Sequence, residues 1–421
     1  MRLHWAWVVA GVSFIALVGA ASFRAAPGAL IEPLRAEFGW STATISLAIS
    51  INLLLYGLTA PFAAALMDKF GVRVVVTWAL TMVAIGSGLT VFMTASWQLV
   101  LLWGVVVGLG TGSMALAFVA TITGRWFVKH RGLVTGVLTA GGAAGQLVFL
   151  PTIAWLSESY GWRYASLVIC VAALAVVPLA AFFLREYPRD VGLLPLGASE
   201  DTPPPPTGGA ARRALGALTA AARTRPFWLL AGGFAICGAS TNGLVGTHFI
   251  PAAHDHGMPT TTAAGLLALV GVFDIVGTIA SGWLTDRVDS RLLLAGYYAL
   301  RGLSLMLLPQ LFGESAHPSM LVFIIFYGLD WVATVPPTVA LCRQYFGMSG
   351  PVVFGWVFAS HQLGAAIAAS AAGLTRDHLG SYDLAWYVAG ALCIGAAVLS
   401  ASLARSPEET PRDLTRQGAA G

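Results

Sequence analysis

Residues 63–73 read AAALMDKFGVR, and residues 280–291 read ASGWLTDRVDSR. Each stretch ends a long apolar run with an acidic residue, Asp68 or Asp286, that is followed at once by a basic residue. The two acids stand 218 positions apart in a chain of 421 residues, so they occupy the same relative place in its two halves. The sequence therefore suggests that the chain contains one structural unit twice.

Further landmarks support this duplication. Four more pairs follow the same offset: Gly39 and Gly257, Arg125 and Arg343, Gly132 and Gly350, and, with one residue added, Gly161 and Gly380. Because five ordered pairs agree in the same topological places, we infer an internal repeat, which is typical of duplicated transporter bundles.

The composition places most of the chain in lipid. Hydrophobic residues make up 57% and charged residues 10% of the sequence, whereas soluble proteins are roughly 25% charged. A helix needs roughly 20 apolar residues to cross a bilayer. Because lipid cannot form hydrogen bonds with backbone N–H and C=O groups, runs of this length must be helices. Twelve runs qualify: 6–30, 43–66, 74–93, 98–123, 132–155, 163–184, 227–250, 262–284, 292–312, 319–341, 352–374 and 384–404.

The predicted fold is all-α and membrane-integral, with twelve transmembrane helices in two pseudo-symmetric six-helix bundles. Residues 185–226, with four consecutive prolines and six arginines, follow the sixth run and are predicted to form a linker. The expected units are an N-terminal bundle at 1–184, a cytoplasmic linker at 185–226, a C-terminal bundle at 227–404 and a cytoplasmic tail at 405–421.

The basic residues predict the orientation. Eighteen of the 23 fall on one side if the N-terminus is cytoplasmic, and only Arg35, Arg163 and Arg376 fall on the other. This bias predicts a multi-pass protein of the inner (cytoplasmic) membrane, surrounded by the lipid bilayer, with both termini cytoplasmic. Because the charges are spread over the loops, the net charge of +4 does not indicate nucleic acid as a partner.

The stretches at 63–73 and 280–291 resemble the G-x-x-x-D-R-x-G-R-R signature of the major facilitator superfamily. They depart from it at Ala64, where the signature has glycine, and at Asp289-Ser290, where it has Gly-Arg. With six spans, a linker and six further spans, the resemblance covers the whole chain and implies the major facilitator fold.

Three other stretches resemble the bacterial monocarboxylate and oxalate/formate porter branch: HWAWVVAG at 4–11, RWFVKHRG at 125–132 and GWVFASHQLGAA at 355–366. In monocarboxylate porters an acid in span 8 precedes, by four residues, an arginine that binds the substrate carboxylate. Asp274 matches the acid, but Thr278 replaces the arginine, and Ala25 replaces a span 1 lysine of animal members.

Four ionisable residues fall within predicted spans, where charge is costly and therefore marks functional candidates. Arg24, Asp274, Arg301 and Asp330 lie in spans 1, 8, 9 and 10. If all four faced one cavity, the two positive and two negative charges would nearly cancel. Protonation of one aspartate would then leave the site with a net positive charge. We predict that both arginines bind a substrate carboxylate through their planar forks and that both acids couple protons. Alternatively, Arg301 and Asp330 form a permanent buried pair that fixes helix packing.

Other polar residues complete the predicted site. Under the offset of 218, Tyr56 is the repeat counterpart of Asp274, and Asn242 is the counterpart of Arg24. Tyr56 and Asn242 are therefore predicted to bind substrate. His361 could serve protons or merely pack helices. The charges that end the repeated stretches are predicted to lock an inner gate, although they could simply set topology. They are Asp68, Arg73, Asp286 and Arg287.

Taken together, these residues predict a monomeric secondary active transporter. It would move a small, monocarboxylate-like organic anion by alternating access, with proton symport. No phosphate-binding loop, nucleophile with a base, or metal-ligand spacing occurs, so we expect no enzyme activity, cofactor or metal. The alternatives are proton-coupled efflux of an apolar or cationic compound, and a non-transporting membrane sensor on the same fold.

Overall fold

The computed structural model describes residues 4–114, 116–200 and 209–403. The predicted tail at 405–421 and the proline run of the linker at 203–206 lie outside the described residues. Within the described ranges, twelve helical spans are long and apolar enough to cross a membrane. All twelve predicted spans are therefore confirmed, whereas the predicted limits of the larger units stay a prediction.

The first six spans contain eight α-helices. Five of these spans are single or nearly continuous, and the fourth includes a π-helical segment at Val100–Val107 between α4 and α5. The bounds are α1 (Trp5–Phe38), α2 (Thr42–Phe70), α3 (Val72–Leu89), α4 (Ser96–Leu99), α5 (Gly108–Ser113), α6 (Leu116–Trp126), α7 (Arg131–Tyr160) and α8 (Trp162–Phe183).

The described part of the linker contributes one α-helix, and the second six spans contain eight more. A π-helical segment at Ala239–Val245 joins α10 to α11 in the seventh span, and α14 and α15 together form the tenth. The bounds are α9 (Ala210–Ala221), α10 (Arg225–Gly238), α11 (Gly246–Asp255), α12 (Thr260–Thr285), α13 (Ser290–Leu307), α14 (Pro318–Asp330), α15 (Val335–Phe346), α16 (Gly350–Leu379) and α17 (Asp383–Ala401).

The first helix is longer than the apolar run that predicted it. The run ends near residue 30, but α1 continues to Phe38 because polar residues outside the hydrocarbon core can still be helical. Arg35 donates to Glu32 one turn earlier at 2.7 Å, a pair spacing that supports a helix. Gly39, with φ +67°, then ends α1 in the left-handed conformation that glycine adopts at little cost.

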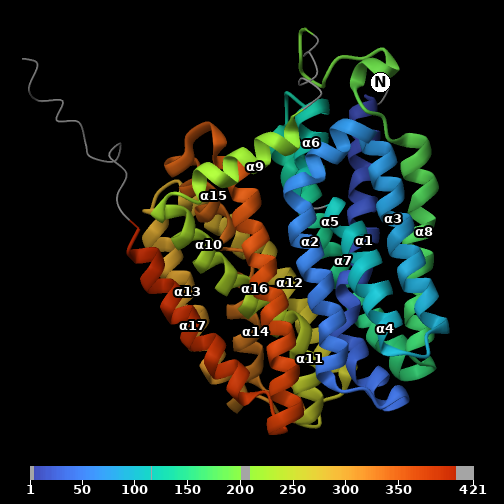
Figure 1. Ribbon diagram of the computed structural model, residues 1–421, viewed down its shortest axis with the longest axis vertical. Coiled ribbons are helices and arrows are strands. Elements are labelled where there is room, and N and C mark those ends of the chain that lie inside the picture. Colours follow the sequence, from blue (N-terminus) through green and yellow to red (C-terminus); the bar gives the residue numbers. More distant parts are fainter. Residues whose placement is uncertain (1–3, 115, 201–208, 404–421) are drawn as a thin grey trace, which may run out of the picture.

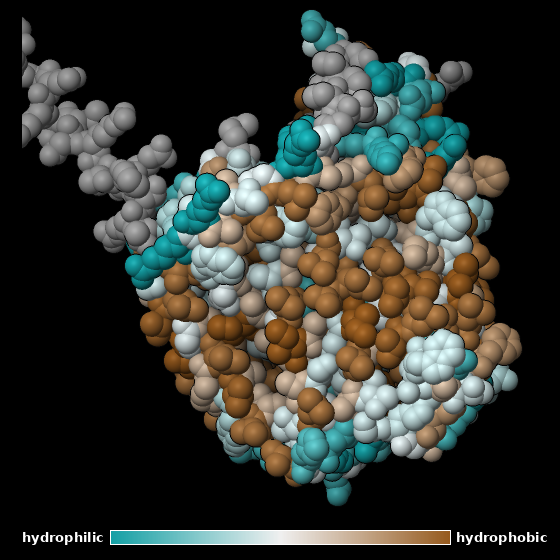
Figure 2. Space-filling view, in the orientation of Figure 1, coloured by the Kyte–Doolittle hydropathy of each residue, from teal (hydrophilic) through white to brown (hydrophobic). Residues whose placement is uncertain are grey.

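Figure 1 shows the two halves side by side, with α1 to α8 on one side and α10 to α17 on the other. Helix α9 crosses between them at one end of the molecule, which we call the linker side; the opposite end is the far side. The visible surface in Figure 2 carries a broad band of hydrophobic residues, with hydrophilic residues gathered at both ends. A band of this kind is the surface that lipid requires.

The seam between the two bundles is formed mainly by α2 packing along α16, by α7 against α12, and by α1 against α11. Close contact along α16 depends on glycine. A Cβ added to Gly57 of α2 would lie 2.4 Å from the Cβ of Gln362, and one added to Gly238 of α10 would lie 1.8 Å from the carbonyl oxygen of His361. Larger residues at these two positions would force α16 away from its neighbours.

Candidate functional site

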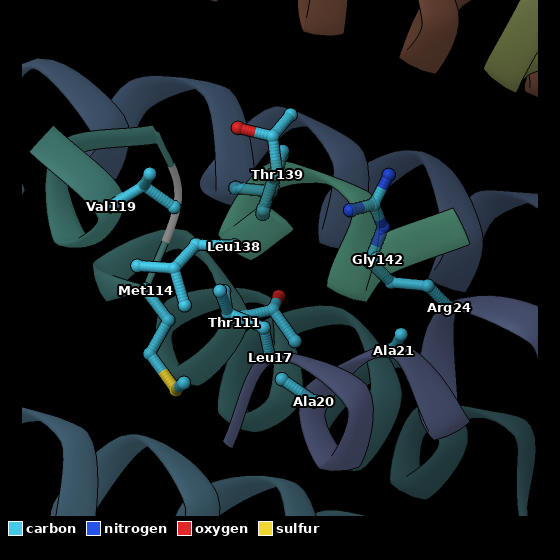
Figure 3. A pocket seen from close by; sticks show the side chains of 11 residues that line it. Leu17, Ala20, Ala21, Arg24, Thr111, Met114, Val119, Leu138, Thr139 and Gly142 are labelled. Atoms are coloured by element: carbon cyan, nitrogen blue, oxygen red, sulfur yellow. The ribbon is translucent and has the colours of Figure 1, made fainter. Parts of the chain in front are cut away.

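Residues of the N-terminal bundle line a cavity at Arg24, with about 520 Å³ of space that protein atoms leave empty, part of it open to solvent. Its polar lining comes from Arg24, Tyr56, Thr111 and Thr139. Figure 3 shows the side chains of α1, α5, α6 and α7 that converge on it. The rest of the lining is small or apolar: Leu17, Ala20, Ala21, Met114, Val119, Leu138 and Gly142.

Within the described part of the chain, the guanidinium of Arg24 makes a ring contact and no hydrogen bond. Its guanidinium lies 5.3 Å from the centre of the Tyr56 ring, within the range of a cation–π contact. Among the ion pairs of residues 4–114, 116–200 and 209–403, none includes Arg24. A guanidinium carries five N–H donors in a planar fork that matches a carboxylate. The cavity therefore presents one positive group to a ligand of small size.

The cavity extends into the half of the bilayer nearest the linker. Val119 lies seven residues before the end of α6 at Trp126, and Thr139 lies eight residues after the start of α7 at Arg131. At 1.5 Å per residue, both are only about 10–12 Å from the linker-side ends of their helices. A hydrocarbon core is roughly 30 Å thick, so these two residues lie well short of the far side.

A second polar cluster is buried in the C-terminal bundle around Arg301, which has no exposed surface. Its Nε donates to Oδ2 of Asp330 at 2.6 Å, and its Nη1 donates to the sulfur of Cys237 at 2.9 Å. The rings of Tyr298 and Tyr327 lie about 6 Å from the guanidinium. The buried pair that the sequence left open as an alternative is therefore present, and Asp330 keeps Oδ1 buried without a hydrogen bond among the described residues.

This cluster sits at a break in the tenth span. Between Asp330, where α14 ends, and Val335, where α15 begins, the helix is interrupted, and backbone hydrogen bonds such as that from Val335 to Val332 satisfy only some of the groups. Side chains from neighbouring helices bind others. Asp274 of α12 accepts from the N–H of Val332 at 3.1 Å, and Nη2 of Arg301 donates to the carbonyl oxygen of Asp330 at 2.5 Å.

Arg301 Nη2 also donates to the carbonyl oxygen of Trp331 at 3.3 Å, and two further contacts at the break come from small side chains. The Ser281 hydroxyl donates to the carbonyl oxygen of Ala333, and the Cys237 sulfur lies 3.3 Å from the Thr334 hydroxyl. Irregular backbone at membrane depth is tolerated where protein groups satisfy it, and discontinuous helices commonly form transport sites. The break is thus stabilised by side chains of the C-terminal bundle.

The four ionisable residues do not share one cavity in this structure. Arg24 lies in the N-terminal bundle, whereas Asp274, Arg301 and Asp330 lie together around the tenth-span break. Asp274 also accepts from the hydroxyl of Thr278 at 3.0 Å and is not hydrogen-bonded to Arg301. In this conformation Arg301 is paired with Asp330 and not with Asp274. The assigned roles of all four residues stay predictions.

Aromatic rings connect the Arg24 cavity to the seam between the bundles. The Tyr56 ring meets that of Phe358 on α16 at 5.9 Å, and Phe358 stacks on His361 at 5.8 Å. His361 is buried, and its Nδ1 has no hydrogen bond within the part of the chain that the structure describes. Asn242, the fourth predicted substrate contact, is half-buried in the π-helical segment of the seventh span.

On the linker side, the predicted gate residues make contacts within one bundle. Asp68 at the end of α2 accepts from Arg125 of α6 at 2.7 Å, and Arg125 also donates to Glu186 at 3.3 Å. The Glu186 carboxylate accepts from the backbone N–H groups of Val72 and Arg73, at 2.7 and 3.1 Å. These groups hold together the start of α3 and the ends of α2 and α6.

The corresponding residues of the second half are arranged differently. Arg287 donates to the carbonyl oxygen of Trp283 at 3.0 Å and lies over the ring of that tryptophan at 4.1 Å. Arg343, the repeat counterpart of Arg125, is exposed. Neither half shows a bond between bundles from the gate residues in the described ranges, so their gating role stays a prediction.

The contrast between Arg125 and Arg343 predicts different stabilities for matched variants. We expect Arg125→Ala to lower the free energy of unfolding by about 1–3 kcal/mol, because it leaves Asp68 and Glu186 without their charged partner. Arg343→Ala should change it by less than about 0.5 kcal/mol, as surface substitutions usually do. Thermal unfolding in detergent compares the two; equal losses would contradict the importance of this network.

Sequence reasoning assigned no role to several residues that the structure brings to these sites. Thr111 and Thr139 line the cavity, but isolated threonines in apolar runs carry no signal. Arg125 stood out as a repeat landmark, and that signal could have identified it. The partner Glu186 lies 118 residues after Asp68, a separation at which sequence alone indicates no contact.

Comparison with known proteins agrees with this architecture. A family model described as Major Facilitator Superfamily matches residues 12–353. The chain is 29% identical to monocarboxylate transporter 13 of Rattus norvegicus, over 94% of this chain and 88% of the relative. It is 27% identical to YcxA, an uncharacterised transporter of Bacillus subtilis, over 95% of both chains.

Solved structures agree on the fold. The crystal structure of a D-xylose-proton symporter superposes with a TM-score of 0.72 at 14% identity, over 95% of this chain and 98% of the other. A partially occluded, inward-open form of the xylose transporter XylE from E. coli gives 0.68 at 15% identity, over 94% and 98%. Together the matches confirm the predicted twelve-helix fold and describe a multi-pass membrane transporter rather than an enzyme.

Proposed function

The chain belongs to the Major Facilitator Superfamily, and we propose that it is a secondary active transporter of a small, monocarboxylate-like organic anion. The observation that carries this proposal is the Arg24 guanidinium, which lines a cavity and has no acidic partner among the described residues. A carboxylate entering the cavity would supply the partner that the described residues do not. The relatives named monocarboxylate transporters support the same class of substrate.

The size and lining of the cavity favour a small anion. Apart from Arg24 and Tyr56, the polar side chains are two threonines whose hydroxyls already donate to backbone carbonyls of their own helices. They leave only oxygen acceptors, which do not attract an anion, so in this proposal the charge of Arg24 supplies the attraction for a carboxylate. The other lining residues are small or apolar, and they would contact a short carbon chain.

We propose proton symport as the coupling, with Asp274 and Asp330 as the proton-carrying groups. Asp330 leaves one carboxylate oxygen without a hydrogen bond, and Asp274 binds the broken tenth span directly through Val332. A proton on either carboxyl would change a contact that holds the break, which links protonation to a movement of the C-terminal bundle. The bundles would then alternate about the α2–α16 and α7–α12 seam.

The distribution of basic residues supports an orientation in the membrane. We propose that the protein lies in the cytoplasmic membrane with the linker side and both termini in the cytoplasm. An inward proton gradient would then drive uptake, with the anion released on the linker side. As a separate part of the proposal, the protein acts as a monomer.

Uptake of labelled lactate into proteoliposomes tests the proposal, with and without an inward proton gradient. We expect the gradient to drive accumulation by the wild-type protein, and Asp274→Asn to abolish it while lactate exchange at equal pH persists. The asparagine oxygen can still accept from Val332, so the break is kept, but the side chain no longer binds a proton.

The matched control is Thr278→Ala, which removes a hydrogen bond to Asp274 and leaves its carboxyl in place. This variant should still accumulate lactate. Gradient-driven accumulation by Asp274→Asn would contradict the proton role of Asp274. Absence of lactate uptake by the wild-type protein at any pH would remove lactate as a substrate, and failure with other small carboxylates would favour efflux of a cationic compound.

A further inference from the structure

On the far side, two carboxylates join the bundles by binding the first turns of helices in the opposite bundle. Asp377, near the end of α16, accepts from the backbone N–H of Thr42 at 3.0 Å and from that of Ala43 at 2.7 Å, at the start of α2. Glu158, near the end of α7, accepts from the N–H of Thr261 at 3.0 Å, at the start of α12. Each contact crosses from one bundle to the other.

The chemistry of helix ends explains why these contacts form. The first four N–H groups of a helix have no partner within it, and the helix dipole places partial positive charge there. A carboxylate satisfies both conditions. In α12 the N-cap residue is Pro259, which has no side-chain acceptor, so Glu158 supplies the cap that the local sequence lacks.

The two contacts are repeats of each other. Asp377 stands 219 positions after Glu158, and Thr261 stands 218 positions after Ala43. The extra residue is the one that also separates Gly161 from Gly380. The duplicated halves therefore exchange the same interaction: the fifth span of the N-terminal bundle caps the C-terminal bundle, and its counterpart α16 caps the N-terminal bundle.

Nearby ion pairs on the same side stay within one bundle. Arg163 of α8 donates to Glu37 of α1 at 2.8 Å. Arg376 of α16 donates to Asp255 of α11 at 2.6 and 2.9 Å, which fixes the end of α16 beside Asp377. These pairs would move with their bundles as rigid groups, whereas the two caps must break before the bundles can separate on the far side.

We propose that Asp377 and Glu158 form a two-part latch that holds the far side closed while the Arg24 cavity faces the linker side. The inference rests on the alternating access proposed above. Both carboxylates are exposed, so water replaces the lost contacts when the far side opens. The latch thus biases the equilibrium between the two states without making either inaccessible.

Hydrogen exchange of the full-length protein in lipid nanodiscs tests the latch, read by mass spectrometry. Removing a helix cap commonly costs about 1 kcal/mol, or about a fivefold change in an equilibrium constant. Because the caps lie at separate helix ends, we expect Asp377→Ala and Glu158→Ala each to favour the far-side-open state about fivefold, and the double variant about 25-fold.

We expect hydrogen exchange to change in opposite directions on the two sides of the protein. Exchange should rise in the far-side seam at residues 26–34 of α1 and 246–253 of α11, and should fall at residues 133–142 of α7 as the linker side closes. Glu37→Ala is the matched control, since it removes an exposed carboxylate of the same side that bonds only within its own bundle. Glu158→Gln keeps an acceptor for Thr261 and should shift the equilibrium less than Glu158→Ala.

Three results would overturn the latch: no change in exchange, a change confined to the first turns of α2 and α12, or the same change in Glu37→Ala. The measurement needs no substrate. If the double variant shows the two-directional shift while the wild-type protein takes up no carboxylate, the latch stands and the proposed substrate is wrong. If uptake is confirmed without the shift, the latch alone is wrong.

Discussion

Replacing Arg24 by glutamine is expected to lower the initial rate of carboxylate uptake about 10- to 150-fold at substrate concentrations below half-saturation. A hydrogen bond to a charged group contributes about 1.5–3 kcal/mol, and the guanidinium of Arg24, which has no ion pair among the described residues, is the positive group of the cavity. Glutamine keeps the length of the side chain in part but offers neither the charge nor the planar fork. Initial rates of labelled uptake into proteoliposomes give the measurement.

Two further variants sharpen this prediction. Arg24→Lys keeps the charge as a single point and should recover only part of the rate, because it cannot bind both carboxylate oxygens in parallel. Thr139→Val alters another polar group of the same cavity without touching its charge and should retain most of the uptake. Unchanged uptake in Arg24→Gln, with a thermal stability equal to the wild type, would exclude Arg24 as the anion contact.

Replacing Arg301 by methionine is expected to lower the free energy of unfolding by about 3–5 kcal/mol. Removal of one partner of a buried ion pair leaves the other charge without compensation, and here Asp330 would remain inside the bundle. The substitution also frees the carbonyl oxygen of Asp330 at the tenth-span break. Thermal unfolding in detergent, together with the yield of monodisperse protein, measures the loss.

The double variant Arg301→Met with Asp330→Leu separates structure from transport. Because it removes both charges, it should regain most of the stability. If Asp330 carries protons, the same variant should still lack gradient-driven accumulation. Wild-type stability in the single Arg301→Met variant would show that the pair is not required for folding, and normal accumulation in the double variant would exclude a coupling role for Asp330.

The sequence predicted the fold because lipid leaves an apolar chain few alternatives. Every run of roughly 20 apolar residues became a helical span, and the offset of 218 residues identified the two halves. The break in the tenth span was missed, although Pro336 and Pro337 follow it and lack the N–H groups that a continuous helix needs. The exact place of the break depends on Asp274 and Arg301, which reach it from other helices.

The sequence identified the ionisable candidates for the site, whose roles stay predictions, and it offered the Arg301–Asp330 pair only as an alternative. Ionisable residues in apolar runs are conspicuous, so Arg24, Asp274, Arg301 and Asp330 could be found without a structure. Which arginine pairs with which acid depends on helix rotation and depth, and these are set by side-chain packing over the whole bundle. For this reason the sequence could not separate the Arg24 cavity from the Arg301 cluster.

The reciprocal caps have a consequence for the origin of the chain. A half-length ancestor that associated as a two-fold symmetric dimer would present one carboxylate and one helix start per subunit, and symmetry would turn them into two identical contacts. A single acidic substitution would then have strengthened the dimer twice. Gene fusion through a linker would preserve both contacts, after which the acids could diverge independently into the Glu158 and Asp377 of the present chain.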